Sequence, residues 1–152
     1  MPLALLVKLM KESTYEFYKV LEHTADMALE VYGRNLKELF SNTAFALFDV
    51  VANLSEVEEK TQRVISLHAI DLERLMVKWL NELLYYYEVE NLLFKRFEIK
   101  KLEPGELEAI AYGEVFREGV HVIFTNPKAV THHKIEIAEG PEGWRAKIII
   151  DL

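Results

Sequence analysis

The chain ends on "WRAKIIIDL", residues 144–152, and this stretch decides how the other elements must be arranged. Successive side chains of a β-strand point to opposite faces of its sheet, so Ile149 and Asp151 share one face. Ile148 and Ile150 share the other face. Both faces are apolar, which is typical of a strand in the middle of a sheet. We therefore expect Asp151, an acid at the end of such a strand, to be partly desolvated.

Strand and turn signals recur upstream of this stretch. Residues 140–143 predict a tight turn, so "KAVTHHKIEIA" at 128–138 pairs antiparallel with the last strand. Residues 104–105 predict a second hairpin. Residues 15–21 and 27–32 alternate and are rich in aromatic and β-branched side chains, as strands are. The other predicted strands span 56–69, 92–103, 106–116 and 121–124.

Two helices are predicted from capping residues and from apolar side chains at helical spacing. Asn35 is a good N-cap for a helix over 36–52, with Glu38 as its capping-box partner. Asp71 caps a second helix, whose apolar stripe runs from Leu72 to Tyr87. We expect the α+β class, specifically a two-layer sandwich. In it, two main helices pack on one face of a mostly antiparallel sheet of about six or seven strands.

Length and composition indicate one globular domain over residues 1–152, because no linker or low-complexity segment divides the chain. The sequence leaves open whether residues 1–9 are an upstream extension and Met10 the start. A net charge of −7 argues against direct binding of nucleic acid, and no apolar run is long enough to cross a membrane. The absence of cysteine excludes disulfides and thiolate chemistry. The opening "MPLALLVKLM" does not resemble a signal peptide, so we expect a cytoplasmic protein.

Carboxylates are the strongest candidates for chemistry, because the chain contains no nucleotide-binding, serine-hydrolase or zinc-protease motif. The terminal carboxylate of Leu152 can lie beside the Asp151 side chain, and two such charges ~4 Å apart repel by ~4 kcal/mol at an effective dielectric near 20. A cation or a basic neighbour would relieve that repulsion. If Asp26 joined them, three carboxylates would form an oxygen site of the Ca²⁺ or Mg²⁺ type. From the pattern alone, Asp26 is also consistent with an ordinary turn residue.

Other polar residues carry weaker signals. His23 is placed to polarise a group near Asp26, although a lone histidine is more often structural. Lys128 follows a predicted turn and is either solvent-exposed or a cation that reaches an acidic site or a partner's phosphate. His132 and His133 are adjacent in a predicted strand, so they face opposite sides and cannot easily share a metal.

Four stretches together resemble the archease family: "LEHTAD" at 21–26, "WLNELLY" at 79–85, "KAVTHH" at 128–133 and the terminal "DL". The resemblance extends over about residues 15–152. It includes two departures. His132 stands where the family has an aromatic residue, so a role for His132 is in doubt. Lys78 replaces an acid that is common before "WLNELL", and we expect it on the outer side of the helix.

The resemblance implies an accessory protein and not an enzyme. Archeases activate the RtcB-type tRNA-splicing RNA ligase, which uses GTP and Mn²⁺, by promoting the ligase–guanylate intermediate and multiple turnover. The family's metal site, in which calcium is bound, would correspond to Asp26, Asp151 and Leu152, and Lys128 would take part in activation. Other RNA-processing enzymes are further candidate partners. Two alternatives remain open from the residues alone: a metal-dependent hydrolase and a chaperone-like protein-binding module.

Overall fold

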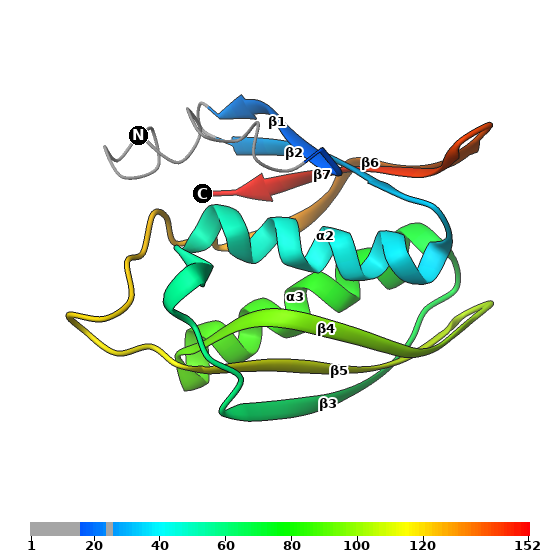
Figure 1. The fold of residues 1–152 in the computed structure, drawn as a ribbon. Helices are drawn as coiled ribbons and strands as arrows, with labels where there is room; N and C mark the ends of the chain where they lie inside the picture. The colour runs from blue at the N-terminus through cyan, green and yellow to red at the C-terminus, as the bar shows by residue number, and fades with distance from the viewer. Residues whose placement is uncertain (1–15, 24–25) are drawn as a thin grey trace.

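The computed structural model describes residues 16–23 and 26–152 and arranges them as two antiparallel sheets with two helices between them (Figure 1). The predicted α+β class, with seven strands and two main helices, is confirmed. Residues 1–9, the candidate extension, lie outside the described residues. The elements are β1 (Tyr18–His23), β2 (Asp26–Gly33), α2 (Leu36–Val51), η2 (Leu54–Glu56), β3 (Thr61–His68), α3 (Leu72–Glu90), β4 (Leu92–Glu103), β5 (Glu106–Val115), β6 (Ala129–Gly140) and β7 (Gly143–Asp151).

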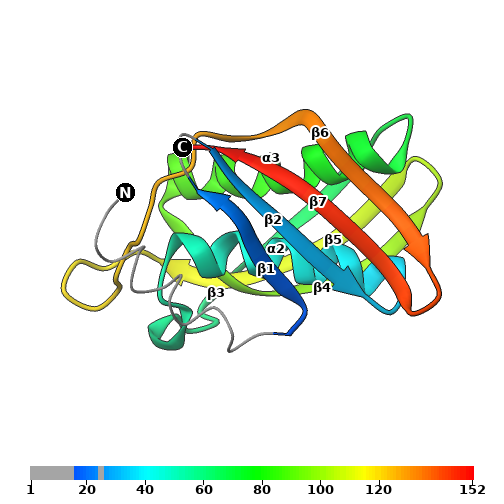
Figure 2. The same ribbon diagram turned by 90° about the horizontal axis from the view of Figure 1, so that it is seen from above.

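The last strand lies inside its sheet, as its sequence predicts. The four-stranded sheet has the order β1-β2-β7-β6, so β7 is paired on both sides (Figure 2). Ile148 and Ile150 are at most 1% exposed, and Ile149 on the other face is 8% exposed. Burial of both faces therefore makes β7 the structural centre of this sheet.

The seven strands form two sheets instead of the single sheet that was expected. The second sheet has the order β3-β5-β4, and the helices contact both sheets. The reason lies in α2, whose buried residues surround the helix and do not form one stripe. A helix that is apolar on so many sides needs cover above and below it. The buried residues of α2 are Leu39, Phe40, Thr43, Ala44, Ala46, Leu47, Phe48, Asp49, Val50 and Val51.

The predicted helix starts are confirmed in atomic detail. The Asn35 side chain accepts a hydrogen bond from the Glu38 N–H at 2.9 Å, and the Asp71 side chain accepts one from the Arg74 N–H at 2.8 Å. The Glu38 carboxylate accepts from the N–H of Arg34, one residue before the cap, so the capping box is displaced by one position. These caps fix the start of both helices between the sheets.

The predicted strand at 121–124 is not formed. A single bridge between Ala52 and Ile123 is the only pairing of this segment with another element, within the described chain. The loop that follows β5 is instead fastened to the end of α2, where the Phe124 N–H donates to the Val51 carbonyl oxygen at 2.7 Å. This loop leads the chain from one sheet to the start of β6 in the other.

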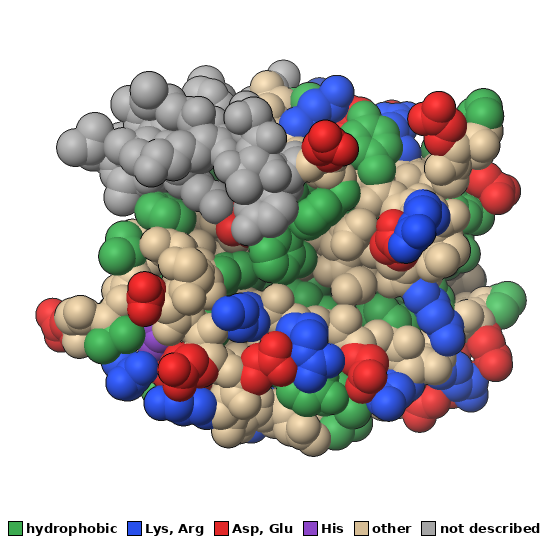
Figure 3. Space-filling model, in the orientation of Figure 1, with side chains coloured by type: hydrophobic (Ala, Val, Ile, Leu, Met, Phe, Trp, Pro, Cys, Tyr) green, Lys and Arg blue, Asp and Glu red, His purple; other side chains and the backbone are tan. Residues whose placement is uncertain are grey.

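The charged clusters of the sequence lie on the surface. Figure 3 shows basic and acidic side chains interspersed over the lower part of one face. Arg96, for example, pairs with Glu59 at 2.9 Å and lies over the ring of Tyr112. No helix in the described part of the chain is long and apolar enough to cross a membrane.

Gly113 lies where two strands of the three-stranded sheet pack too closely for a side chain. A Cβ atom at this position would lie 1.9 Å from the backbone oxygen of Leu93, which cannot rotate away. We expect Gly113→Ala to lower the free energy of unfolding by about 3 kcal/mol or more, as overpacking of rigid neighbours does. Gly140→Ala is the control, because nothing lies within 4 Å of a Cβ there. Its effect should stay within about 0.5 kcal/mol. Urea unfolding measures both, and equal losses would show that Gly113 is not closely packed against Leu93.

Candidate metal centre

Two aspartates lie opposite each other at one end of the four-stranded sheet. Asp26 is the first residue of β2 and Asp151 the last residue of β7, and the antiparallel register pairs them directly. Their neighbours Met27 and Ile150 are buried toward the helices, so both carboxylates take the outer face of the sheet. Asp26 is exposed and Asp151 is half-buried. We call these two residues the carboxylate pair.

The carboxylate pair is electrostatically unfavourable as it stands. Side chains directly opposite on one face of a sheet have Cβ atoms about 5 Å apart, and like charges there are destabilising. Two unit charges ~4 Å apart repel by ~1 kcal/mol in bulk water, and cross-strand side-chain pairs contribute roughly 0.2 to 1 kcal/mol. Neither Asp26 nor Asp151 forms an ion pair with any other described residue.

Charge pairing elsewhere on the same face follows the opposite rule. Glu30 is the register partner of Lys19 on one side and of Lys147 on the other. Arg145 lies 3.8 Å from Glu30 and 3.7 Å from Glu136. The outer face thus pairs acids with bases along its length. The carboxylate pair at its end departs from that rule.

A second pair of facing acids is neutralised by a lysine of the protein itself. Glu103 and Glu106 are register partners at the β4–β5 hairpin. The Lys101 amine lies 3.2 Å from a Glu106 oxygen and 3.9 Å from a Glu103 oxygen. No described side chain does this for Asp26 and Asp151. Carboxylate oxygens are the ligands that hard divalent cations prefer, so the donor chemistry fits such an ion.

Side chains alone do not complete a metal site. Among the side chains that the structure describes, which exclude those of residues 22–25, there is no group of three His, Cys, Asp or Glu that could hold a metal. An ion bound by the carboxylate pair would therefore need further oxygens. The half-buried Leu152, which follows Asp151 directly, could supply main-chain oxygens at this position.

Lys128 directly precedes β6 and lies beside Asp151. Its backbone N–H donates to the Asp151 carbonyl oxygen at 2.8 Å, and the next residue, Ala129, is the register partner of Asp151. Lys128 is exposed, and its amine has no described carboxylate within ion-pair range. The start of β2, the start of β6 and the end of β7 thus meet at one end of the sheet (Figure 2).

The histidines divide between this end and the rest of β6. His23 ends β1, and its backbone is paired with that of Met27, next to Asp26. Its side chain, like Thr24 and Ala25 of "LEHTAD", lies outside the described residues. His132 and His133 are both exposed and occupy the segment where the β6–β7 register shifts. The structure does not bring these two to the carboxylate pair.

Asn81 fixes the start of β6 and was not singled out by its sequence. Its side-chain amide donates to the Val130 carbonyl oxygen at 2.9 Å, and its side-chain oxygen accepts from the Val130 N–H at 2.8 Å. β6 is an edge strand, so this side chain from α3 takes the place of a neighbouring strand. The only sequence signal is an asparagine, a poor helix former, within the apolar stripe of α3 next to Leu80 and Leu83.

A buried acid anchors the loop that leads to Lys128. A Glu114 side-chain oxygen accepts from the Glu58 N–H at 2.6 Å. Arg117, His121 and Lys60 surround the same carboxylate at 3.3 to 3.9 Å. Burial raises the pKa of Glu114. The hydrogen bond from the Glu58 N–H and the nearby Arg117, His121 and Lys60 together lower that pKa by a larger amount. The net result is a pKa below the ordinary value of 4.5.

We expect Asn81→Ala to loosen the start of β6 specifically. The substitution leaves the N–H and carbonyl of Val130 without partners, which should cost about 1 to 3 kcal/mol of stability. Amide hydrogen exchange at Lys128 and Val130 should become faster. Asn42→Ala is the control, because its side chain also bonds a backbone oxygen, that of Tyr32, at the other end of β2. Unchanged exchange at Val130 in Asn81→Ala would contradict this role.

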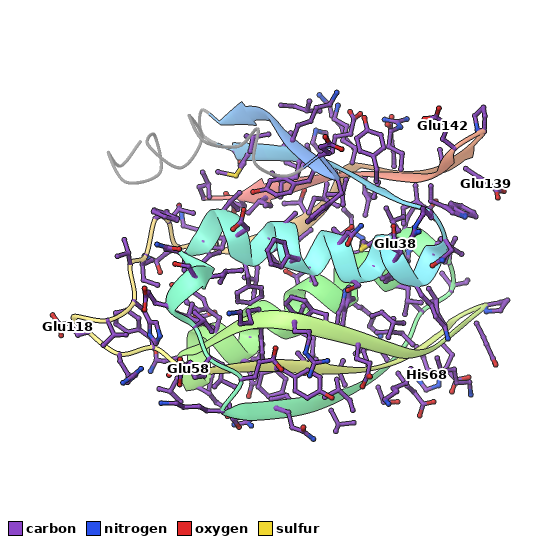
Figure 4. The ribbon with its side chains drawn as sticks, in the orientation of Figure 1. Glu38, Glu58, His68, Glu118, Glu139 and Glu142 are labelled. Carbon is purple, nitrogen blue, oxygen red and sulfur yellow. The ribbon has the colours of Figure 1, made fainter. Side chains whose placement is uncertain are left out.

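Glu114 should make stability depend on acidity. The pKa of Glu114 is lower in the folded protein than in the unfolded chain. Its contribution to stability is therefore fully present above pH 4.5 and is lost as the pH falls through the lower pKa of the folded state. At pH 7 Glu114→Gln should be about 1 to 3 kcal/mol less stable than the parent. The difference should shrink below pH 4.5. Thermal unfolding between pH 7 and 3 measures this, with Glu118→Gln as the control at the exposed tip of the loop (Figure 4). A difference independent of pH would contradict the assignment.

Comparison with known proteins gives one consistent result. Residues 18–152 match the model of the "Archease protein family (MTH1598/TM1083)". The protein archease of Methanosarcina acetivorans is 40% identical over 139 residues, which cover 89% of this chain and 95% of the relative. The protein archease of Pyrococcus abyssi is 41% identical over 135 residues, covering 86% and 95%.

Solved structures agree with the fold. The solution structure of protein 1598 from Methanobacterium thermoautotrophicum superposes with a TM-score of 0.79 at 34% identity, over 91% of this chain and all of that one. An archease from Thermotoga maritima, titled "possible chaperone", has a TM-score of 0.59 at 22% identity, over 87% of this chain and 94% of that one, and supports the fold alone. With the family model, the curated relatives and the fold in agreement, this chain belongs to the archease family.

Proposed function

We propose that this protein is an accessory factor that activates an RtcB-type, GTP-dependent tRNA-splicing RNA ligase. In this proposal it promotes formation of the ligase–guanylate intermediate and so permits multiple turnover. It acts through a divalent-cation site and through Lys128. The proposal combines family membership with the residues at the end of the four-stranded sheet.

The observation that carries the proposal is the direct pairing of Asp26 with Asp151 on one face, without a described counter-charge. A like-charge pair that the rest of the protein does not neutralise is a functional candidate, because it lowers stability and needs a positive ligand. The other like-charge pair, Glu103 and Glu106, has Lys101 for this purpose. The contrast favours an external cation at Asp26 and Asp151.

The proposed ligands are the side chains of Asp26 and Asp151 and a main-chain oxygen of Leu152. A bound divalent cation would supply a concentrated positive charge that can attract phosphate or carboxylate oxygens of the ligase. Asp26 and Asp151 would hold and orient it, since the sheet fixes both of their backbones. Calcium and manganese are both suitable probes for such an oxygen site.

Lys128 would complete the contact with the ligase. Its position beside Asp151 is fixed by the backbone hydrogen bond, while its amine remains exposed. A lysine amine is a flexible point charge that suits phosphate or carboxylate groups. In this proposal the cation, whose charge its carboxylate ligands balance, offers open coordination positions to anionic oxygens of the ligase, and the Lys128 amine supplies the unpaired positive charge beside it. Activation would then proceed by delivery of the ion or by rearrangement of ligase groups.

Neutralising one member of the carboxylate pair should have opposite effects on stability and ion binding. We expect Asp26→Asn to raise the stability of the chelator-treated protein by roughly 0.2 to 1 kcal/mol, because it removes the repulsion. Its affinity for Ca²⁺ and Mn²⁺ should fall at least about tenfold. Calorimetric titration and thermal unfolding measure the two effects. Glu103→Gln is the control and should leave ion affinity unchanged, whereas equal affinity in Asp26→Asn would refute the site.

Ligase activation is tested in the same variants. Guanylylation of a purified RtcB-type ligase with GTP and Mn²⁺ should be accelerated by this protein. Asp26→Asn, Lys128→Ala or a C-terminal extension should reduce that acceleration, and Glu103→Gln should not. If Asp26→Asn activates fully while surface apolar substitutions abolish activation, a chaperone-like module replaces the proposal. Turnover of a phosphoester by the isolated protein with metal would instead support the hydrolase alternative.

A further inference from the structure

The hydroxyl of Thr131 is buried without a hydrogen-bond partner. It is the only side-chain nitrogen or oxygen atom in the described chain with this property. Thr43, by comparison, is fully buried and donates to the Leu39 carbonyl oxygen at 2.7 Å. An unsatisfied buried hydroxyl costs about 1 to 3 kcal/mol, so its presence requires an explanation.

Thr131 lies next to the carboxylate pair and on the same face. It is two residues beyond Ala129, the register partner of Asp151, and alternate residues of a strand share a face. Val130 between them is buried toward the helices. The cross-strand partner of Thr131 is Ile149, whose side chain is apolar and cannot accept its hydrogen bond.

The separation suits an indirect contact with a bound ion. Diagonal cross-strand neighbours such as Thr131 and Asp151 have Cα atoms about 7 to 8 Å apart, and their Cβ atoms are somewhat closer. That is too far for both side chains to ligate one ion at about 2.3 to 2.6 Å. The separation between the two side chains matches two steps: a bond from the ion to an oxygen atom, and a hydrogen bond of about 2.8 Å from that oxygen to the Thr131 hydroxyl. Ala129, the register partner of Asp151, has only a methyl side chain. Because the Thr131 oxygen is buried, its side chain must turn about the Cα–Cβ bond to reach such an oxygen.

We propose that the Thr131 hydroxyl hydrogen-bonds an oxygen atom bound to the cation held by the carboxylate pair. In the free protein this oxygen belongs to a water molecule. The inference rests on the ion site of the proposed function and adds Thr131 as a positioning residue for it. Groups that hold the ligands of a metal in place in this way commonly raise affinity 10- to 100-fold.

The backbone around Thr131 is fixed in place before any ion binds. Asn81 holds the preceding residue, Val130, through two hydrogen bonds. The Lys128 N–H holds the start of the strand to Asp151. The register shift of β6 begins only after Thr131, so this residue is the last one aligned with the end of β7. Such preorganisation is what a hydrogen bond to an ion-bound oxygen needs.

Thr131→Val tests the inference, because it removes the hydroxyl and keeps the β-branched shape. The chelator-treated variant should be at least as stable as the parent, since an unsatisfied polar group has been removed. Its affinity for Ca²⁺ and Mn²⁺ in calorimetric titration should fall about tenfold. Thr131→Ser should retain the affinity. Thr43→Val is the matched control: it should lose stability, because its hydroxyl is bonded, and bind ions normally.

The outcomes separate this inference from the proposed function. If the parent binds the ions and Thr131→Val binds them equally well, the role of Thr131 is refuted and the ion site stands. A chelator-treated Thr131→Val that is less stable than the parent also refutes it, because the hydroxyl would then have a partner within the protein. If the parent itself binds neither ion, the ion site is refuted and the role of Thr131 with it.

Discussion

The register between β2 and β7 is the constraint on which the rest of the structure depends. Met27, Leu29, Ile148 and Ile150 fill the space between this sheet and the helices. A slip of one residue would turn the apolar side chains of one strand to the outer face, and the core therefore specifies the pairing strongly. The same register brings Asp26 against Asp151. Hydrophobic burial thus enforces a contact that electrostatics alone would break.

This arrangement separates the parts of the molecule that stabilise it from the parts that are available for binding. The inner face of the four-stranded sheet is apolar, and most of the outer face pairs acids with bases. At the end of the sheet the pattern changes to two facing acids and a hydroxyl without a partner. Such local departures from good packing and pairing are expected where a protein binds something else. They persist because the surrounding strands leave their backbones no alternative.

Sequence patterns predicted the elements well and their assembly only in part. The caps at Asn35 and Asp71 are visible because local chemistry decides them. The central position of β7 follows from "KIIID", which is apolar on both faces. The division into two sheets could not be predicted from the sequence. The spacing of apolar residues shows that a helix is buried, but not how many layers cover it. Residues 121–124 have the composition of a strand, but backbone hydrogen bonds to the end of α2 and the residues after it hold them instead.

The candidate site shows the same limit. Asp151 can be singled out from its place at the end of an apolar strand, and the family resemblance points to Asp26 and Lys128. Asn81 and Glu114 act through hydrogen bonds to backbone groups 49 and 56 positions away along the chain. No local pattern encodes such a partner. The missing partner of Thr131 is likewise a property of the folded surroundings and not of the sequence.

The positions of Asp26 and Asp151 also have a consequence for folding. They stand near the two ends of the described chain, so a ligand held by both closes a loop that contains almost the entire fold. Cross-links of this kind remove more entropy from the unfolded chain the longer the loop they close. An ion bound by both aspartates would act as a reversible cross-link, and the stability it adds would depend on the concentration of the free ion. The integrity of the domain and the occupancy of its binding end would then rise and fall together.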